Sequence, residues 1–294
     1  MQDDQLDVVM RLHDASRTAE LGRAVFSLVG QDHRPLRILL CVQRFTPAMM
    51  AGVEDTLAPL LAMSGAPTLA VVNHTDPLPR DARAALLNRG LAAATGRYLA
   101  FLDYDDTVYP EAYALLVARL RAAGAAIAFG GIAQKQTEFE DDLPFVLAKR
   151  LRPWQGRTIA DLFEENFCPL HSFVLDRMRL PPALRFEETL TRLEDYDFLL
   201  RVCAACRADF SLIDTIVGDY YMKTDGSNST PMGGETSDAN IAAWHRARTT
   251  LEARRRTTLV APEVQRAAGL PAPVPGLTIR GLLDRLGRRA APAA

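Results

Sequence analysis

Three carboxylates gather in the short segment Asp103-Tyr104-Asp105-Asp106, directly after an apolar run at residues 98–102. Carboxylates this close repel one another unless a cation or solvent compensates their charge. Their hard oxygen atoms favour Mg²⁺ or Mn²⁺, and such a cation also bridges to the phosphates of a substrate. The cluster therefore predicts a metal-assisted phosphate site. The simpler alternative is an acidic turn left in solvent.

A second acidic pair, Glu194 and Asp195, stands where a helix is expected to begin. Acids in a first helical turn are stabilised by the helix dipole, and Asp197 with Arg201 has the spacing of an ion pair along a helix. A carboxylate in a cleft can instead accept a proton as a general base. The residues alone leave both interpretations of Glu194 and Asp195 open.

The cysteines offer less chemistry. Cys203 and Cys206 have the spacing of a redox or metal motif, but no second pair follows them. Both fall in an amphipathic helix beside Phe198 and Leu199, which favours small buried hydrophobic side chains over a metal or redox role.

The elements that must position these acids follow a clear alternation in the first half of the chain. Apolar strands are expected at residues 6–12, 36–42, 68–72 and 98–102, and helices at 17–29, 47–60, 80–95 and 110–123. This order predicts an α/β fold with a mostly parallel sheet flanked by helices. Ligands of such sheets bind beyond the carboxyl ends of the strands, which is where residues 103–106 stand.

After Gly131 the alternation weakens, and we expect this half to build a wall that faces the substrate. We divide the chain into a catalytic domain, residues 1–230, and a C-terminal extension, residues 231–294, which is helical or partly disordered. Glycine, serine and proline between 226 and 238 predict a mobile loop at this boundary. Within the basic tail, residues 276–289 form an amphipathic helix, which either contacts an anionic membrane or packs on the protein.

Composition excludes several classes of protein. The formal net charge is -2 and 48% of residues are hydrophobic, so no global electrostatic case exists for nucleic acid as a partner. No apolar stretch reaches the length of a membrane span, and the acidic N-terminus lacks the order of a signal peptide. We therefore expect a cytoplasmic protein, with peripheral contact at the inner face of the membrane as an open alternative.

The wider context of the aspartates resembles the inverting family 2 glycosyltransferases, which have the GT-A (Rossmann-like) fold. The helix at 82–96, with its Asn88-Arg89-Gly90 segment, precedes the apolar strand and the aspartates in the family's order. Upstream, residues 24–36 resemble its first helix and second strand. Downstream, residues 192–201 (RLEDYDFLLR) resemble its Glu-Asp base motif. The resemblance covers roughly residues 6 to 230.

The resemblance implies transfer of a sugar from a nucleotide diphosphate to an acceptor hydroxyl, with polysaccharide or another glycoconjugate as product. It places Asp103 near the ribose, makes Asp105 the ligand of Mn²⁺ or Mg²⁺, and lets Asp106 support the cluster. Asp195 becomes the catalytic base, with Glu194 beside the acceptor. A UDP-sugar is the default donor, and a sugar or glycolipid is the acceptor.

Further positions follow from the same resemblance. Arg83 matches a basic residue that reaches the diphosphate, and His171 stands in a stretch that lines the acceptor side. Lys223, with Ser227, Asn228 and Ser229 after it, falls in a segment like the family's closing loop. One departure concerns the second strand, where Val42-Gln43 replaces the usual acidic residues. Gln43 then becomes the candidate for contacting the base through its amide.

Two alternatives remain at this stage. The local phrase from Phe101 to Pro110 also resembles the first motif of haloacid-dehalogenase-like phosphatases, which would make Asp103 a phosphoryl-accepting nucleophile. That motif normally opens its fold, whereas three predicted strands precede it here. A non-catalytic sugar-nucleotide-binding relative is the other alternative.

Overall fold

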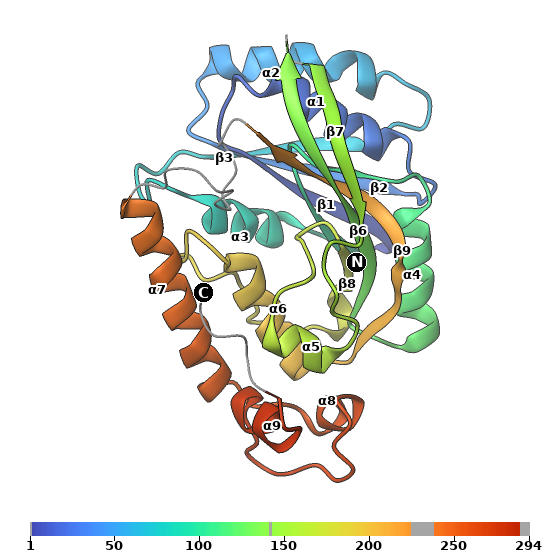
Figure 1. Cartoon of the computed structure of the whole chain (residues 1–294). Coiled ribbons are helices and arrows are strands. Elements are labelled where there is room, and N and C mark those ends of the chain that lie inside the picture. Colours follow the sequence, from blue (N-terminus) through green and yellow to red (C-terminus); the bar gives the residue numbers. More distant parts are fainter. Residues whose placement is uncertain (1, 141–142, 225–237, 289–294) are drawn as a thin grey trace.

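The computed structural model describes residues 2–140, 143–224 and 238–288, and Figure 1 shows their arrangement. The first half alternates strands and helices as the sequence predicts. Its elements are β1 (Gln2–Leu12), α1 (Thr18–Val29), β2 (Leu36–Gln43), α2 (Pro47–Leu61), β3 (Thr68–His74), α3 (Arg83–Ala93), β4 (Gly96–Asp103), β5 (Thr107–Val108) and α4 (Ala112–Ala123).

The second half contains longer strands and is less regular. Its elements are β6 (Ile127–Glu140), β7 (Leu143–Leu151), α5 (Ile159–Glu164), β8 (Phe173–Asp176), the 3₁₀ turn η1 (Arg177–Arg179), α6 (Glu194–Ala205) and β9 (Ala208–Lys223). Three helices follow, which are α7 (Asp238–Thr257), α8 (Pro262–Ala267) and α9 (Ile279–Arg285).

The described strands form one sheet in the order β3-β2-β1-β4-β8-β6-β9-β5, with β7 paired to β6. β3, β2, β1 and β4 are parallel, as predicted. β8 runs antiparallel to both β4 and β6, while β6 and β9 pair in parallel. The carboxyl ends of β1, β2 and β4 therefore meet at one edge of the sheet, where β4 ends at Asp103.

Alternation along the strands divides the core into two layers. In β4, Tyr98, Ala100 and Leu102 pack into the layer that contains residues of α1, α2 and α4. Leu99 and Phe101 point the other way, into the layer with α3, α5 and α6. By the same two-residue period, Asp103 emerges on the α3 and α6 side. The carboxylate of Asp103 therefore lies on the side of the sheet where α6 begins.

The C-terminal helices share the core of the rest of the chain. Leu251 of α7 and Ile279, Leu282 and Leu283 of α9 are buried in the same layer as Phe198 of α6. Figure 1 shows α7 beside this part of the molecule, with α8 and α9 beyond it. The predicted boundary at residue 230 and the predicted loop as far as residue 237 lie outside the described residues, and Asp238 begins α7.

This packing bears on the two alternatives that the sequence leaves open for residues 276–289, contact with a membrane or packing on the protein. The apolar side chains of α9 are 0% exposed and lie inside the protein, so they do not form a surface that a membrane can contact. The alternative, a tail packed on its own protein, is the one observed. Within the described residues, no helix has the length and apolar character needed to cross a bilayer.

The cysteines behave as predicted. All four are free and buried, and burial raises the pKa of the Cys206 thiol. Cys203 is 0% exposed in the apolar core, consistent with small hydrophobic packing.

One strand leaves apolar side chains in solvent. β7 pairs only with β6 among the described strands, and it exposes large hydrophobic side chains along most of its length. These are Leu143, Phe145, Val146, Leu147 and Leu151. The register between β6 and β7 shifts at Gln136/Thr137.

Candidate active site

Asp103 is held by an arginine from the neighbouring strand. Arg11 of β1 lies directly opposite Asp103 in the parallel register. Its Nε is 2.5 Å from Oδ1 and its Nη2 is 3.0 Å from Oδ2, a bidentate pair. Burial alone would raise the pKa of Asp103, but the Arg11 guanidinium outweighs it and holds that pKa below its usual range. Asp103 is therefore a carboxylate at neutral pH.

The same arginine reaches the second acidic motif. Arg11 Nη1 lies 2.6 Å from Oε1 of Glu194, whose side chain is buried at the first residue of α6. One guanidinium thus connects the end of β4 to the start of α6. The two acidic motifs, separated by about ninety residues in the sequence, belong to one site.

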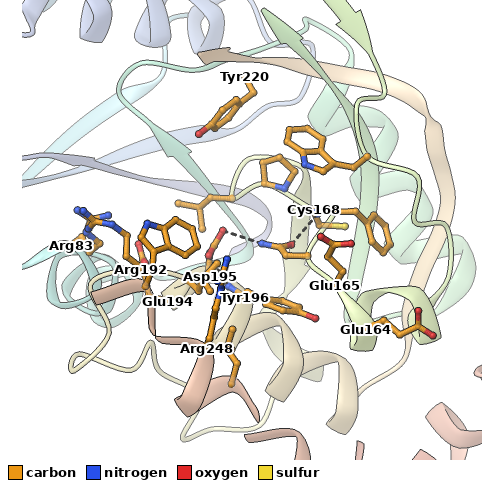
Figure 2. Close-up of a pocket in the computed structure, with 18 of the residues that line it drawn as sticks. Arg83, Glu164, Glu165, Cys168, Arg192, Glu194, Asp195, Tyr196, Tyr220 and Arg248 are labelled. Carbon is orange, nitrogen blue, oxygen red and sulfur yellow. Dashed lines mark hydrogen bonds between the residues drawn. The ribbon is translucent and has the colours of Figure 1, made fainter. Parts of the chain in front are cut away.

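Asp195 follows Glu194 and is compensated differently. Its Oδ1 accepts a hydrogen bond of 2.8 Å from the backbone N–H of Tyr196, and its Oδ2 accepts one of 3.4 Å from Nδ2 of Asn166. Figure 2 shows this contact as a dashed line, together with the hydrogen bond that the backbone N–H of Cys168 donates to Oδ1 of Asn166. Burial, followed by the charge of Glu194, raises the pKa of Asp195 to about 7. This carboxyl can gain and lose a proton near neutral pH.

A residue with a strained backbone, Leu193, directly precedes Glu194 and Asp195. Leu193 has φ +60°, in the left-handed region that non-glycine residues rarely adopt. The backbone turns there into α6, so that Glu194 faces Arg11 and Asp195 faces a cavity. Strain of this kind persists where the surroundings hold a functional geometry in place.

Asp105 pairs with a lysine from the end of β9. Lys223 Nζ is 3.1 Å from Oδ2 of Asp105 and 2.6 Å from Oε1 of Glu20. Burial and the nearby charge of Asp106 nevertheless raise the pKa of Asp105 to about 7. Lys223 itself is buried in the sheet rather than in the segment after it. Ser227, Asn228 and Ser229, assigned with it to a closing loop, lie outside the described residues.

Asp106 and His171 form a buried pair behind the site. Asp106 accepts a 3.0 Å hydrogen bond from the Tyr221 backbone, and its other oxygen is 3.2 Å from Nδ1 of His171. Burial lowers the pKa of His171, but the Asp106 carboxylate prevails and raises it. His171 is only 1% exposed and stacks on Tyr220 at 6.3 Å. The structure thus places His171 beside Asp106 and outside the linings of the two cavities described below.

Gln43 and Arg83 border the site with their side chains already engaged. The amide of Gln43 donates to the carbonyl of Arg80 at 2.9 Å and accepts from the N–H of Ala82 at 3.2 Å. It fixes the segment that leads into α3. Arg83 pairs with Asp81, at 3.0 Å through Nε and 2.9 Å through Nη2.

Two adjoining cavities open onto these residues. The strand-end cavity, about 650 Å³, lies among His13, Gln43, Asp81, Tyr104 and Asp105. The helix-side cavity, about 750 Å³, is bordered by α6 and α7 and contains Asp195 and Asn166 (Figure 2). Residues common to both linings are Arg11, Arg83, Asp103, Asp106, Arg192 and Tyr220.

Sequence reasoning missed several of these lining residues. Arg11 carries no motif, and only the pairing of β1 with β4 identifies it. Arg192 is the first residue of the segment that resembles the base motif, but the sequence assigned it no role; its guanidinium donates to Asn240 Oδ1 at 2.9 Å. Tyr220, Trp244 and Arg248 belong to elements that the sequence did not connect with the acids. An aromatic residue in a strand has no local sign that it borders a cavity.

Comparison with known proteins agrees with this geometry. Residues 77–179 match the family model described as "Glycosyl transferase family 2". The succinoglycan biosynthesis protein ExoO of Rhizobium meliloti (strain 1021) is 30% identical over 232 residues, which cover 75% of this chain and 62% of that protein. The chain thus spans less than two thirds of this relative's length.

Solved structures show the same fold at low identity. TarS of S. aureus superposes with a TM-score of 0.57 at 12% identity, covering 90% of this chain and 42% of TarS. The mannosyltransferase PcManGT of Pyrobaculum calidifontis, in complex with GDP-Man and Mn²⁺, superposes with a TM-score of 0.54 at 14% identity, covering 98% and 80%. These likenesses confirm the predicted GT-A-like fold. The matched family model over residues 77–179 and the sequence of the relative both relate this chain to glycosyltransferase family 2.

Proposed function

We propose that this chain transfers a sugar from a nucleotide diphosphate to an acceptor hydroxyl, with inversion, in the assembly of a polysaccharide. The observation that carries the proposal is the junction of the two cavities. Asp103 and Asp105 face the strand-end cavity, Asp195 faces the helix-side cavity, and Arg11 connects the two sides. A donor in the first and an acceptor in the second would meet between them.

The donor occupies the strand-end cavity in this proposal. Neighbours of the same fold were solved with UDP-GlcNAc, in the case of TarS, and with GDP-Man, in the case of PcManGT. Arg83 and Arg192 border the junction, where a diphosphate would need positive charge. Asp103 would then lie near the ribose. Because the amide of Gln43 is bound to backbone, this residue would shape the base site through the segment it holds.

A divalent cation, Mn²⁺ or Mg²⁺, would be held by Asp105. The residues fit such an ion, because burial and then the charge of Asp106 raise the pKa of Asp105 to about 7 despite Lys223, and a bound cation would stabilise the charged carboxylate. When bound, the cation supplies Lewis-acid stabilisation of the leaving diphosphate. Among the described residues, no group of three His, Cys, Asp or Glu side chains is arranged to hold a metal ion, so substrate oxygens would complete the coordination.

Asp195 acts as the base. The acceptor hydroxyl must lose its proton as it attacks the sugar, and a carboxylate with a pKa near 7 is both deprotonated and basic enough to take it. Asn166 and the Tyr196 N–H orient its two oxygens. Glu194 is occupied by Arg11, so it would stabilise the site rather than accept the proton.

The bidentate contact of Arg11 also bears on the phosphatase alternative. A phosphoryl-accepting aspartate needs a free oxygen aimed at the phosphate. Both oxygens of Asp103 are engaged by Arg11, which favours a binding role for this carboxylate.

The test is Asp195→Asn, which removes the proton acceptor and nearly preserves the shape. We expect donor binding to persist, measured as a thermal shift with UDP- and GDP-sugars in the presence of Mn²⁺. Transfer to an acceptor should fall by about 10²–10⁴-fold. Asp284→Asn, an exposed acid on α9, is the matched control and should transfer normally. Full transfer by the Asp195 variant, or wild-type hydrolysis of phosphate esters through Asp103, would contradict the proposal.

A further inference from the structure

Both tryptophans of the chain line the helix-side cavity. Trp154 follows β7 and packs edge-to-face against Tyr220, with 6.1 Å between ring centroids. Trp244 comes from α7, far away in the sequence. Flat aromatic faces suit the C–H faces of sugar rings, while polar groups around them bind the hydroxyls. Two indole side chains in its lining make the cavity beside Asp195 suitable for a saccharide.

Arg248 adds a charge to this wall. It lies one helical turn after Trp244, and its guanidinium carbon is 5.8 Å from the centroid of the Trp244 ring. Figure 2 shows Arg248 reaching the cavity from α7. The side chain is half-buried and forms no ion pair with any described residue.

Other arginines of the same cavity are compensated. Arg280 pairs with Glu252, and Arg255 donates to the Tyr196 hydroxyl and to the carbonyl of Phe163. Arg11 is shared by Asp103 and Glu194. Arg248 therefore stands apart as a half-buried cation of this wall whose only described partner is an aromatic ring. A ligand anion would stabilise it by a charge-assisted hydrogen bond.

We propose that Trp244 and Arg248 form an acceptor subsite for a saccharide that carries an anionic group, either a phosphate or a carboxylate. The inference rests on the proposed function, since it assigns the acceptor to the helix-side cavity. The sugar ring packs against the tryptophan, and Arg248 binds the anion. The C-terminal segment thereby selects the acceptor, while the strand ends bind the donor.

Tryptophan emission provides the test on the full chain, because both indoles border this cavity. Cellobiose, cellobiouronic acid and cellobiose 1-phosphate are titrated as matched probes without charge, with a carboxylate and with a phosphate. We expect the anionic probes to bind at least tenfold more tightly than cellobiose. The stronger of the two identifies whether the anion is a carboxylate or a phosphate.

Variants then separate the charge from the ring. Arg248→Gln should weaken the anionic probe about tenfold and leave cellobiose unchanged. Arg246→Gln removes an exposed arginine of the same helix that lies outside both cavities, and it should change neither. Trp244→Leu should weaken every probe. Equal binding by wild type and Arg248→Gln, or an absence of emission change with all three probes, would overturn the proposal.

A nucleotide control distinguishes this proposal from the proposed function. Thermal shifts with UDP and Mn²⁺ should be the same in wild type and Arg248→Gln and should be lost in Asp105→Ala. Anion-selective saccharide binding without any nucleotide shift would remove the proposed function and keep the subsite. The opposite pattern would keep the donor site and remove the subsite.

Discussion

The carboxyl groups of the site differ in how their negative charge is compensated. Asp103 and Glu194 share Arg11, Asp106 faces His171, and Asp105 faces Lys223. Asp195 has an amide and a backbone N–H as neighbours, and no ion pair with a described residue. A buried carboxylate without a cation is the one that binds protons most readily. The pKa of Asp105 is also raised to about 7 despite its lysine, but of these two carboxyl groups only Asp195 lines the helix-side cavity, which supports the proposal that Asp195 is the base.

The pKa of Asp195 predicts the pH dependence of the reaction. A base must be deprotonated, so activity should rise as pH increases through about 7 and reach a plateau above it. Transfer measured as kcat/KM from pH 5 to pH 9 tests this, and Asp195→Asn should lose that rise. A wild-type profile that falls across this range would speak against Asp195.

The stability of the fold should depend on pH in the opposite sense to activity, and should fall as pH rises. The folded-state pKa of Asp195 exceeds its unfolded value of 3.8, so its contribution to stability is present below that value and is lost as pH rises toward 7. We expect Asp195→Asn to melt at a higher temperature than wild type at pH 8. The difference in melting temperature between the variant and wild type should become smaller as pH falls.

At the scale of elements, the fold joins residues that the sequence keeps apart. The parallel strands and their helices were predictable, because apolar runs, a capping Thr46 and Gly124 mark their limits. β9 was not predicted, and Lys223 was assigned to a loop. The pairing of β9 with β6 contains several register shifts, and such long-range contacts leave no local pattern in the sequence. Arg11 was not predicted for the same reason, because it meets Asp103 only through the pairing of β1 with β4.

One element-level contact positions the base from behind. Arg255 of α7 donates to the Tyr196 hydroxyl and to the carbonyl of Glu164, at the end of α5. Tyr196 and Asn166, two residues beyond Glu164, are the groups that contact Asp195. Through Arg255, α7 therefore holds Tyr196 and the segment that leads to Asn166, the two residues that contact Asp195.

Replacing Arg255 by lysine should lower kcat about tenfold by loosening this geometry, with little change in donor KM. The pH midpoint of the reaction should shift with it, since the contacts of Asp195 change. Arg256→Lys, on an exposed arginine that contacts only Glu252 among the described residues, is the control and should behave as wild type. A change in donor KM alone would indicate another role for Arg255.

For the whole molecule, the C-terminal helices complete the core. Residues of α7 and α9 occupy the same apolar layer as α6, so the segment predicted as an extension contributes to the stability of the catalytic part. The sequence showed the amphipathic pattern of residues 276–289 correctly. It could not show which surface covers the apolar face, because a membrane and a protein core demand the same pattern.

Leu283→Ala distinguishes these two surfaces. If α9 is part of the core, this substitution should reduce the free energy of unfolding by about 2–5 kcal/mol. Leu259→Ala, in the same segment but 61% exposed, should have little effect. Denaturant unfolding with vesicle sedimentation measures both properties. Unchanged stability with lost binding to anionic vesicles would restore the membrane interpretation.

The exposed apolar face of β7 affects how readily the protein associates with itself at high concentration. An edge strand with free backbone groups is a template on which other chains can add, and β7 carries a proline, Pro144, and an exposed arginine, Arg150, that oppose such addition. These residues should keep concentrated protein dispersed. Arg150→Val should therefore increase light scattering with concentration while the melting temperature stays the same, and Arg150→Lys should not. The solubility of this protein would then depend on one basic side chain and one proline of a strand that pairs with β6.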